Sequence, residues 1–342
     1  MELGLDTFGD VTVDADGTPR TAAQSLRDLV EQAELADRVG IDFIGVGEHH
    51  RDDFAVSAPE VVLGAIAART ERIRVGSAVT VLSSDDPIRV FERFATVDAL
   101  SNGRAEVILG RGSFTESFPL FGYDLAQYEE LFTDKLSLFD LLRRGEPVTW
   151  SGSTRTPLTA QSVYPQLENA PLPTWIAVGG SPESVVRAAS YGLPLMLAII
   201  GGDPLRFTPY ADLYRRALRE TGHDELPIGV HSPGHVADSD SEARDQLWPH
   251  YRVYMDRIGR ERGWPPVTHI EFERATGPGG SLYVGSPDTV AAKIAGTASA
   301  LGLSRFDMKY SHGTLGHAAL MRSIELYGTE VIPRVRALLA AG

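Results

Sequence analysis

Short apolar runs alternate with longer segments of helical spacing along almost the whole chain. In residues 21–39, apolar side chains recur every three or four positions, which is typical of a helix with one buried face. The run DFIGVG at 42–47 is short and apolar without that spacing, which is typical of a buried strand. The pattern predicts eight strands, at 2–8, 42–47, 73–82, 105–110, 174–178, 194–200, 226–236 and 305–310.

Each predicted strand is followed by a helix or by an irregular excursion. The predicted helices cover 21–39, 59–70, 87–100, 125–144, 182–191, 204–221, 241–262, 287–301 and 318–339. Strands that alternate with helices imply parallel pairing through right-handed crossovers. Eight such units predict an α/β fold, a (β/α)8 TIM barrel with insertions, as a single domain over 1–342. The rival is an open doubly wound sheet, and the lack of a GxGxxG motif after the first strand counts against it.

Two segments interrupt the alternation and are predicted to be excursions from the barrel. Residues 146–173 are rich in Pro, Thr and Ser and lack a helical period, so we expect an inserted hairpin or loop. The second excursion covers 240–282 and ends in an irregular Gly/Pro-rich loop at 263–282. Within that loop RATGPGGS (274–281) is a candidate lid, and an ordinary disordered loop is the alternative.

Composition narrows the classes of function. The formal charge of −14 counts against a nucleic-acid partner, because phosphate backbones require a basic face. There is no cysteine, which excludes disulfides, thiolate nucleophiles, Cys-ligated zinc and iron–sulfur clusters. The first residues, MELGLDTFGD, lack the pattern of a signal peptide, and no apolar run is long enough to span a bilayer. We therefore expect a soluble, cytoplasmic protein with no membrane partner.

Ionisable residues gather directly after the second predicted strand, in IDFIGVGEHHRDDF (41–54). Chemistry in a TIM barrel takes place at the carboxyl ends of the strands, so Glu48, His49 and His50 are candidate catalytic residues. Solvated loop charges are the alternative. A metal centre is a further one, but adjacent residues on an extended strand point to opposite faces, and later strand ends offer mostly Gly and Ser. We therefore assign no metal ligand.

Glycine, serine and one arginine follow the fourth and fifth strands, in LGRGSF and WIAVGGSPES. Glycines let a ligand approach the backbone, an arginine pairs with phosphate, and a helix N-terminus attracts anions. A turn with a serine cap explains either segment alone, but the two together predict a phosphorylated cofactor. The candidate cofactor-binding residues here are Gly110, Arg111, Ser113, Gly179, Gly180, Ser181 and Ser184.

Several motifs together resemble the bacterial luciferase-like flavin-dependent monooxygenases. They are GEHH after strand two, VGSAVTVLSSDDPIRVFERFATVDALSNGRAEVILGRGS (75–113), WIAVGGSPESVVRAASYGLP (175–194) and SIELYGTEVIPRVR (323–336). The resemblance covers nearly the whole chain in order. It implies a barrel, usually a homodimer, that takes reduced FMN from a separate NAD(P)H-dependent flavin reductase. It also implies that the flavin reacts with O2 and that a small organic substrate is oxidised.

The resemblance also implies roles for single residues. His49 matches the catalytic histidine beside the flavin ring, with Glu48 and His50 as neighbours. Ala78-Val79 matches a non-prolyl cis peptide that supports the isoalloxazine. The positions that match phosphate contacts are Arg111, Ser181 and Ser184.

The chain departs from bacterial luciferase at three of these positions. Gly110 stands where luciferase has a reactive cysteine, and Gly180 where it has a glutamate. Tyr128 takes the place of another phosphate-binding arginine. These departures count against light emission. A deazaflavin-dependent branch usually carries Asp-His-Phe where this chain has Glu-His-His at 48–50, so FMN is favoured.

Other interpretations stay open. A deazaflavin (F420)-dependent hydride-transfer oxidoreductase would use the same fold, and a non-catalytic flavin-binding protein would not need His49. A metal-dependent hydrolase is a further alternative. The aromatic residues Phe8, Phe54, Phe114 and Phe118 belong either to the core or to an apolar substrate pocket. The sequence does not identify the substrate.

Overall fold

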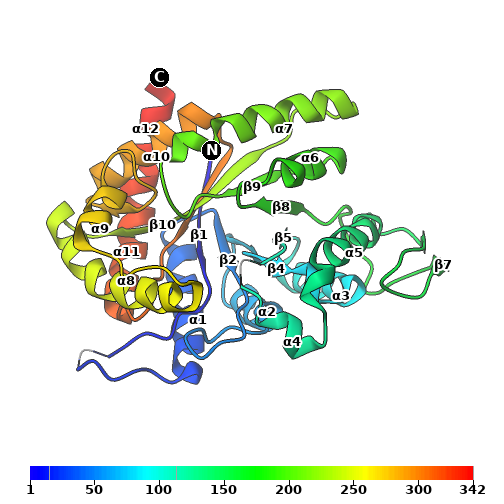
Figure 1. The fold of residues 1–342 in the computed structure, drawn as a ribbon, viewed down its shortest axis with the longest axis horizontal. Helices are drawn as coiled ribbons and strands as arrows, with labels where there is room; N and C mark the ends of the chain where they lie inside the picture. Colours follow the sequence, from blue (N-terminus) through cyan, green and yellow to red (C-terminus); the bar gives the residue numbers. More distant parts are fainter. Residues whose placement is uncertain (15, 113, 342) are drawn as a thin grey trace.

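Parallel strands form the centre of the computed structural model, which describes residues 1–14, 16–112 and 114–341 (Figure 1). The barrel strands are β1 (Glu2–Thr7), β2 (Phe43–Val46), β3 (Arg74–Ser77), β5 (Ala105–Gly110), β8 (Thr174–Val178), β9 (Leu195–Ala198), β10 (Ile228–Val236) and β12 (Arg305–Lys309). They pair in the order β12–β1–β2–β3–β5–β8–β9–β10, and β10 also pairs with β12, which closes the ring. All eight predicted strands and the predicted TIM barrel are confirmed.

The third predicted strand is divided into two pieces. After β3 the chain continues as β4 (Thr80–Val81), which pairs with β5 at Leu109 and Gly110. The peptide bond Ala78-Val79 between the two pieces is cis, as the family resemblance implied.

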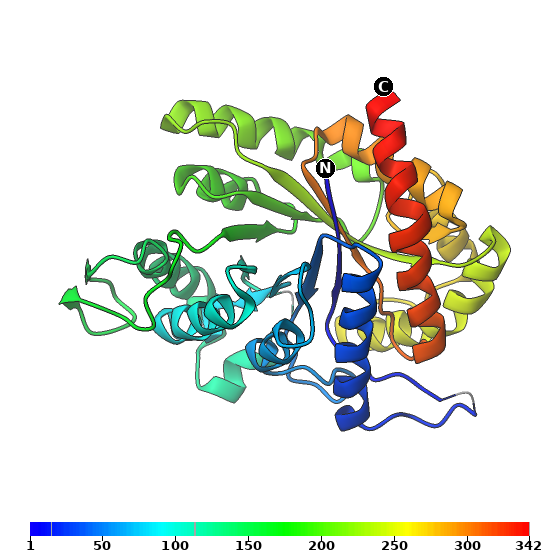
Figure 2. The ribbon, with the colours of Figure 1, turned by 180° about the vertical axis from the view of Figure 1, so that it is seen from behind.

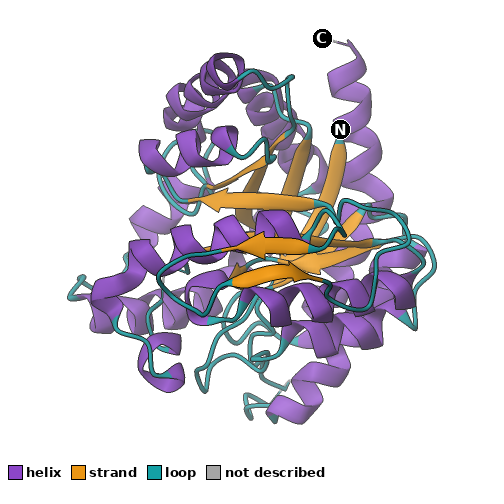
Figure 3. Ribbon diagram, turned by 90° about the vertical axis from the view of Figure 1, so that its right-hand side faces the viewer, coloured by secondary structure: helices purple, strands orange, loops and turns teal. Residues whose placement is uncertain are grey.

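Helices surround the barrel on its outside (Figures 2 and 3). The outer helices are α1 (Ala22–Arg38), α2 (Pro59–Ala67), α3 (Pro87–Ser101), α5 (Tyr128–Leu142), α6 (Pro182–Ser190), α7 (Thr208–Thr221), α10 (Pro287–Leu301), α11 (His317–Leu326) and α12 (Ile332–Ala341). Local signals set their starts: the Thr21 side chain accepts from the backbone N–H of Gln24, and α2, α3, α6 and α10 each have proline in the first turn. The predicted helix 318–339 is interrupted by a π-helical turn at Tyr327–Val331.

Both predicted excursions are present. The first contains an antiparallel hairpin of β6 (Val148–Trp150) and β7 (Leu158–Gln161), which projects from the barrel. The second contains α8 (Asp240–Arg262), α9 (His269–Thr276) and β11 (Tyr283–Gly285), and β11 adds to β10 in parallel. The prediction of an irregular loop over 263–282 is wrong at α9. A capping box of Thr268 and Glu271 satisfies the free N–H groups of its first turn.

The candidate lid, 274–281, is tied to an outer helix. Its first three residues belong to the end of α9. The ammonium group of Lys293, on α10, donates to the carbonyl of Gly277 at 2.7 Å and to that of Leu282 at 2.8 Å. These contacts anchor both ends of the Gly/Pro-rich turn.

The amino-terminal end of the barrel is filled by a buried ionic cluster. The guanidinium of Arg305 pairs with Glu106, and its Nε donates to Asp307 at 2.9 Å. The same guanidinium lies 3.6 Å from the ring centroid of Phe43. Charge pairing offsets the cost of removing these groups from water. The opposite end, where the strands finish, carries the loops and the helices α4 (Ser117–Phe121) and α8 (Figure 1).

Candidate active site at the carboxyl ends of the strands

His49 lies in an aromatic cage at the end of β2. Its ring centroid is 4.8 Å from that of Phe8, 4.6 Å from that of Phe54 and 4.7 Å from that of Phe114. The residue is 9% exposed, so its imidazole is largely shielded from water. Three of the four phenylalanines singled out from the sequence therefore meet around one histidine. The fourth, Phe118, packs on Tyr128 instead.

Glu116 orients His49 from the segment after β5. Its Oε1 lies 2.9 Å from Nδ1 of His49 and also accepts from the backbone N–H of His50 at 3.4 Å. Burial raises the pKa of Glu116, but the hydrogen bond from His49 and nearby backbone N–H groups outweigh it and the net pKa is lowered. The ionised carboxylate accepts from Nδ1–H, which leaves Nε2 of His49 for a ligand. No motif in the sequence indicated Glu116 as a site residue.

Glu48 faces the neighbouring strand rather than the aromatic cage. Its Oε1 accepts from the backbone N–H of Val81, just beyond the cis peptide, at 2.8 Å. Burial, together with the charges of Asp85 and Glu60, raises the pKa of Glu48 to about 7, although the hydrogen bond from Val81 opposes this shift. His50 lies beside it, with Nε2 4.0 Å from the Glu48 carboxylate, and burial lowers the pKa of His50.

Two glycines beside the cis peptide make room for neighbouring side chains. A Cβ atom at Gly110 would lie 2.6 Å from Cγ2 of Val79, and one at Gly47 would lie 2.4 Å from Cδ1 of Phe8. The sequence analysis expected Gly110 to admit a ligand, whereas in the structure the side chain of Val79 occupies the space beside it. Ala78 is 8% exposed and completes this wall of the mouth.

Two arginines meet at the end of β5. Arg111 forms an ion pair with the carboxylate of Glu129, and Nη2 of Arg187 donates to the same carboxylate at 2.9 Å. The guanidinium of Arg111 lies 5.3 Å from the ring centroid of Tyr128, whose hydroxyl donates to the carbonyl of Gly112 at 2.8 Å. Tyr128 thus supports the loop that carries Arg111.

The amino-terminal end of α6 lies beside these arginines. The side chain of Ser181 accepts from the backbone N–H of Ser184 at 3.4 Å and donates to Glu183 at 2.7 Å. The hydrogen bond from Ser181 lowers the pKa of Glu183, and the charges of Arg111 and Arg187 lower it further. Of the cofactor-binding residues predicted from the sequence, Ser113 lies outside the described part of the chain.

The hydrogen-bond donors of Arg111, Arg187 and Ser181, here called the phosphate cradle, fit a phosphate group. Nη1 of Arg187 is buried and has no hydrogen-bond partner among the described residues. A Cβ at Gly179 would have nothing within 4 Å, so there is open space in front of the backbone, and Gly180 has a φ of +115° that a side chain would disfavour. Free N–H groups at the start of a helix and a bidentate guanidinium are the usual partners of phosphate. Arg187 is a cradle residue that the sequence analysis missed.

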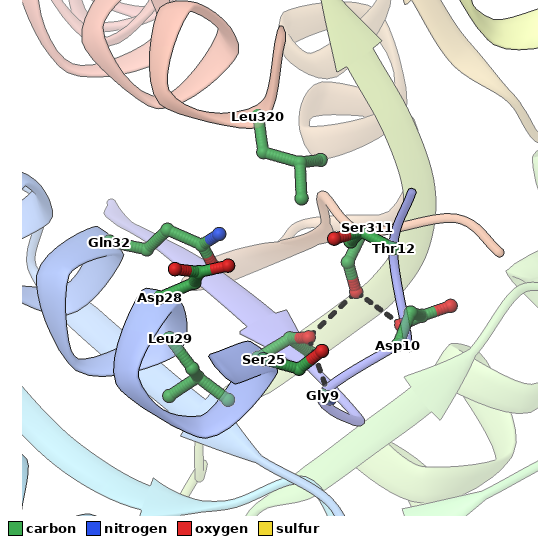
Figure 4. Close-up of a pocket in the computed structure, with 10 residues that line it drawn as sticks. Gly9, Asp10, Thr12, Ser25, Asp28, Leu29, Gln32, Ser311 and Leu320 are labelled. Carbon is green, nitrogen blue, oxygen red and sulfur yellow. Dashed lines mark hydrogen bonds between the residues drawn. The ribbon is translucent and has the colours of Figure 1, made fainter. Parts of the chain in front are cut away.

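A polar network holds the turn after β1 that carries Phe8. The hydroxyl groups of Thr7 and Ser311 lie 2.6 Å apart, and Ser311 donates to Asp10 at 2.5 Å (Figure 4). The Lys309 ammonium donates to the same carboxylate at 3.2 Å. Beside the network is a cavity of about 10 Å³ against α1, which has room for one water molecule. The network fixes Phe8 against His49.

The helix α8 crosses the mouth of the barrel. Near its middle, Nδ1 of His250 lies 2.8 Å from the hydroxyl of Thr314, in the segment after β12. At its end, Glu261 accepts from Arg51 at 2.6 Å, and Arg257 pairs with Asp52, in the loop after β2. The charged residues after the two histidines therefore tie α8 over the site.

The described residues contain one group with metal-ligand spacing, Asp28, Glu31 and His317. It lies on α1 and α11, outside the barrel mouth, and includes none of the residues at 48–50. Asp28 already accepts from Gln24 at 2.7 Å and pairs with Arg20. In the described part of the chain, no helix is long and apolar enough to cross a membrane.

Sequence comparisons with known proteins match one family over most of the chain. A family described as luciferase-like monooxygenase matches residues 7–305. The 4-hydroxyprotoasukamycin monooxygenase of Streptomyces nodosus subsp. asukaensis is 28% identical over 320 residues, which cover 90% of this chain and 86% of that protein. The N-acetyl-S-alkylcysteine monooxygenase of Bacillus subtilis is 32% identical over 226 residues, 65% of this chain and 63% of that protein.

Solved structures match the fold at lower identity. The oxygenating constituent of 3,6-diketocamphane monooxygenase from Pseudomonas putida, in complex with FMN, has a TM-score of 0.77 at 20% identity and covers 98% of this chain and 99% of its own. An F420-dependent secondary alcohol dehydrogenase has a TM-score of 0.74 at 18% identity, with coverage of 98% and 99%. At these identities the structures establish the fold alone.

Proposed function

Because the chain belongs to the luciferase-like monooxygenase family, we propose that it is an FMN-dependent oxidoreductase. Within that class it is a two-component monooxygenase, which uses reduced FMN and O2 on a small organic substrate and acts on paired donors. The observation that carries the proposal is the presence, at one end of the barrel, of the caged His49 and the cradle of Arg111, Arg187 and Ser181. His49 supplies an acid–base group, and the phosphate cradle supplies hydrogen-bond donors to the phosphate.

In this proposal the cradle holds the phosphate of FMN. Arg111 and Arg187 provide guanidinium donors, and the start of α6 provides backbone N–H groups beside Ser181 and Ser184. The partnerless Nη1 of Arg187 supports an anion at this point. When bound, FMN supplies the redox chemistry with oxygen. Ala78 and Val79 at the cis peptide lie on the wall next to β5 and would support the ring system.

His49 is proposed to hold or move a proton at Nε2. Glu116 fixes the orientation of the ring through Nδ1, and the three phenylalanines limit the access of water to it. Glu48, with a pKa of about 7, is proposed to act through β4, whose backbone it holds. His50 is proposed to line the entrance next to Phe121, whose ring centroid lies 4.9 Å away.

The partners follow from the same proposal. A separate NAD(P)H-dependent flavin reductase supplies reduced FMN, and the enzyme acts as a homodimer in the cytoplasm. The net charge of −14 supports a small-molecule substrate over a nucleic acid.

Hydride transfer with a deazaflavin is the second candidate. The barrel also matches the F420-dependent secondary alcohol dehydrogenase with a TM-score of 0.74. A flavin-binding protein without turnover would leave the pairing of His49 with Glu116 without a use.

The phosphate cradle is tested with arginine variants. We expect Arg111→Ala and Arg187→Ala each to weaken FMN binding about tenfold or more, because each removes a charged donor from the phosphate. Riboflavin, which lacks the phosphate, should bind all variants alike. Arg27→Ala, an exposed position on α1, is the matched control. Fluorescence titration measures both ligands, and equal losses for FMN and riboflavin would contradict the assignment.

A further inference from the structure

A second pair of carboxylate and imidazole lies at the mouth of the barrel. Oδ2 of Asp6 is 2.6 Å from Nδ1 of His231. Asp6 is on β1 and His231 on β10, with β12 between them, so a direct contact requires both side chains to point into the barrel. His231 pairs in register with Ala198, the last residue of β9, which puts it at the level where the strands end.

The pair borders the aromatic cage. The ring centroid of His231 lies 6.4 Å from that of Phe8, and Phe8 contacts His49 at 4.8 Å. Phe8 therefore stands between two imidazoles, and each imidazole is held through Nδ1 by a carboxylate. The side chain of His231 is 14% exposed, whereas that of Asp6 is 1% exposed.

The charges that face His231 favour its protonated form. Burial lowers the pKa of His231, but the charge of Asp6 and its hydrogen bond raise it, so that the net pKa is above the usual value. Lys309 opposes this shift and Asp307 adds to it. Because Asp6 engages Nδ1, the proton at Nε2 is the one that a ligand can accept.

Packing alone does not account for the pair. Oδ1 of Asp6 is buried and has no hydrogen-bond partner among the described residues. A buried charge pair costs desolvation, and an unsatisfied oxygen adds to that cost.

We propose that His231 orients the substrate of the proposed monooxygenase, with Nε2–H donating to a carbonyl oxygen, and that Asp6 is the positioning residue for its imidazole. The pair has one positive and one negative charge, so it suits a neutral acceptor oxygen better than a sulfonate or a phosphate. This inference rests on the proposed function, since it takes the caged His49 to serve the flavin.

The test uses an unreactive ketone, 2-octanone, and octanesulfonate as probes, with calorimetry on the protein loaded with oxidised FMN. We expect wild type to bind 2-octanone and to bind octanesulfonate at least about tenfold more weakly. Asp6→Asn and His231→Phe should weaken ketone binding about tenfold or more, because a charge-assisted donor is lost. His223→Gln, at an exposed position after α7, is the matched control. Equal ketone binding by the variants, tighter sulfonate binding, or no ketone binding by wild type would overturn the assignment.

The pH dependence separates positioning from a purely structural role. In wild type, ketone binding should be lost as the pH rises through the raised pKa of His231. In Asp6→Asn that step should move to lower pH, because the charge that raises the pKa is gone. A step that does not move would contradict the role of Asp6. If FMN does not bind at all, the proposed function fails, and ketone titration of the free protein still decides the pair.

Discussion

Single residues in this site act mainly through partners that are distant in the sequence. His49 was predicted from its place after a strand, but Glu116 lies 67 residues away. Asp6 and His231 are 225 residues apart. Arg187 follows Ser184 by less than one helical turn, and its ion pair with Glu129 connects it to Arg111. A sequence motif identifies a polar residue that follows a strand. Its partner across the barrel can be identified only when the three-dimensional closure of the sheet is known.

Glu116→Gln tests the support of His49. The substitution keeps a side-chain oxygen but removes the charge that orients Nδ1–H. We expect the rate of substrate oxidation to fall about tenfold to a hundredfold, less than the roughly 10²- to 10⁴-fold of a complete acid–base contribution, because His49 itself remains. FMN affinity should change by less than about threefold, because the cradle is not touched.

The direct readout is the Nδ1–H proton resonance of His49. It should be protected from solvent exchange in wild type and exchange rapidly in Glu116→Gln. Glu220→Gln, an exposed carboxylate near the end of α7, is the control. An unchanged exchange rate in Glu116→Gln would contradict the role of Glu116.

Glu129 is expected to compete with the phosphate of FMN. Its carboxylate binds both cradle arginines and is 57% exposed. Removing this charge in Glu129→Gln should tighten FMN binding about threefold to tenfold at low salt, because like-charge repulsion with the phosphate is lost. Riboflavin affinity should stay constant, as measured by the same fluorescence titration. Weaker FMN binding in the variant would mean that Glu129 instead positions the arginines.

At the scale of elements, strong periodicity made the fold predictable. The eight barrel strands are apolar runs with turns on both sides, and their bounds agree with the predictions to within a few residues. The missed helix α9 is short and largely polar, and its one clear signal is the capping box from Thr268 to Glu271. The break of the third strand into β3 and β4 has no signature in composition, and here the family resemblance supplied what the pattern could not.

Buried histidines around β10, α8 and β12 should make stability depend on pH. Burial, with the charge of Lys309, lowers the pKa of His312 well below its usual value, and burial lowers those of His235 and His250. The pKa values of these histidines are lower in the folded protein than the value of about 6.5 in the unfolded chain. Their contribution to the free energy of unfolding is therefore present above about pH 6.5 and is lost at lower pH, because the unfolded chain then binds protons that the folded protein does not. The pH range over which stability changes therefore lies below about pH 6.5.

His312→Leu isolates one of these groups. Neither ring nitrogen of His312 has a hydrogen-bond partner among the described residues. As the pH falls below about 6.5, the stability of wild type relative to the variant should decrease, with a limiting slope of about 1.4 kcal/mol per pH unit for one proton. Glu48, with a pKa of about 7, and Asp307, at about 6, act in the opposite direction but are common to both proteins. Urea unfolding measures the difference, and a constant difference would contradict the account.

At the scale of the whole molecule, the barrel separates a closed end from a reactive end. The cluster of Arg305 and Glu106 fills the amino-terminal end, and α8 covers part of the carboxyl end through its ties to the loops after β2 and β12. His49, the phosphate cradle and the pair of Asp6 with His231 all lie at the reactive end. The identity of the cofactor is the claim on which the rest of the account depends.

The most direct test is an anaerobic titration of the protein with reduced FMN and, in parallel, with reduced F420. We predict saturable binding of reduced FMN with one site per chain, weakened by Arg111→Ala and Arg187→Ala. Oxygen admitted afterwards should be consumed in step with oxidation of a bound substrate. Binding of reduced F420 without binding of reduced FMN would contradict the central claim and assign the chain to hydride transfer.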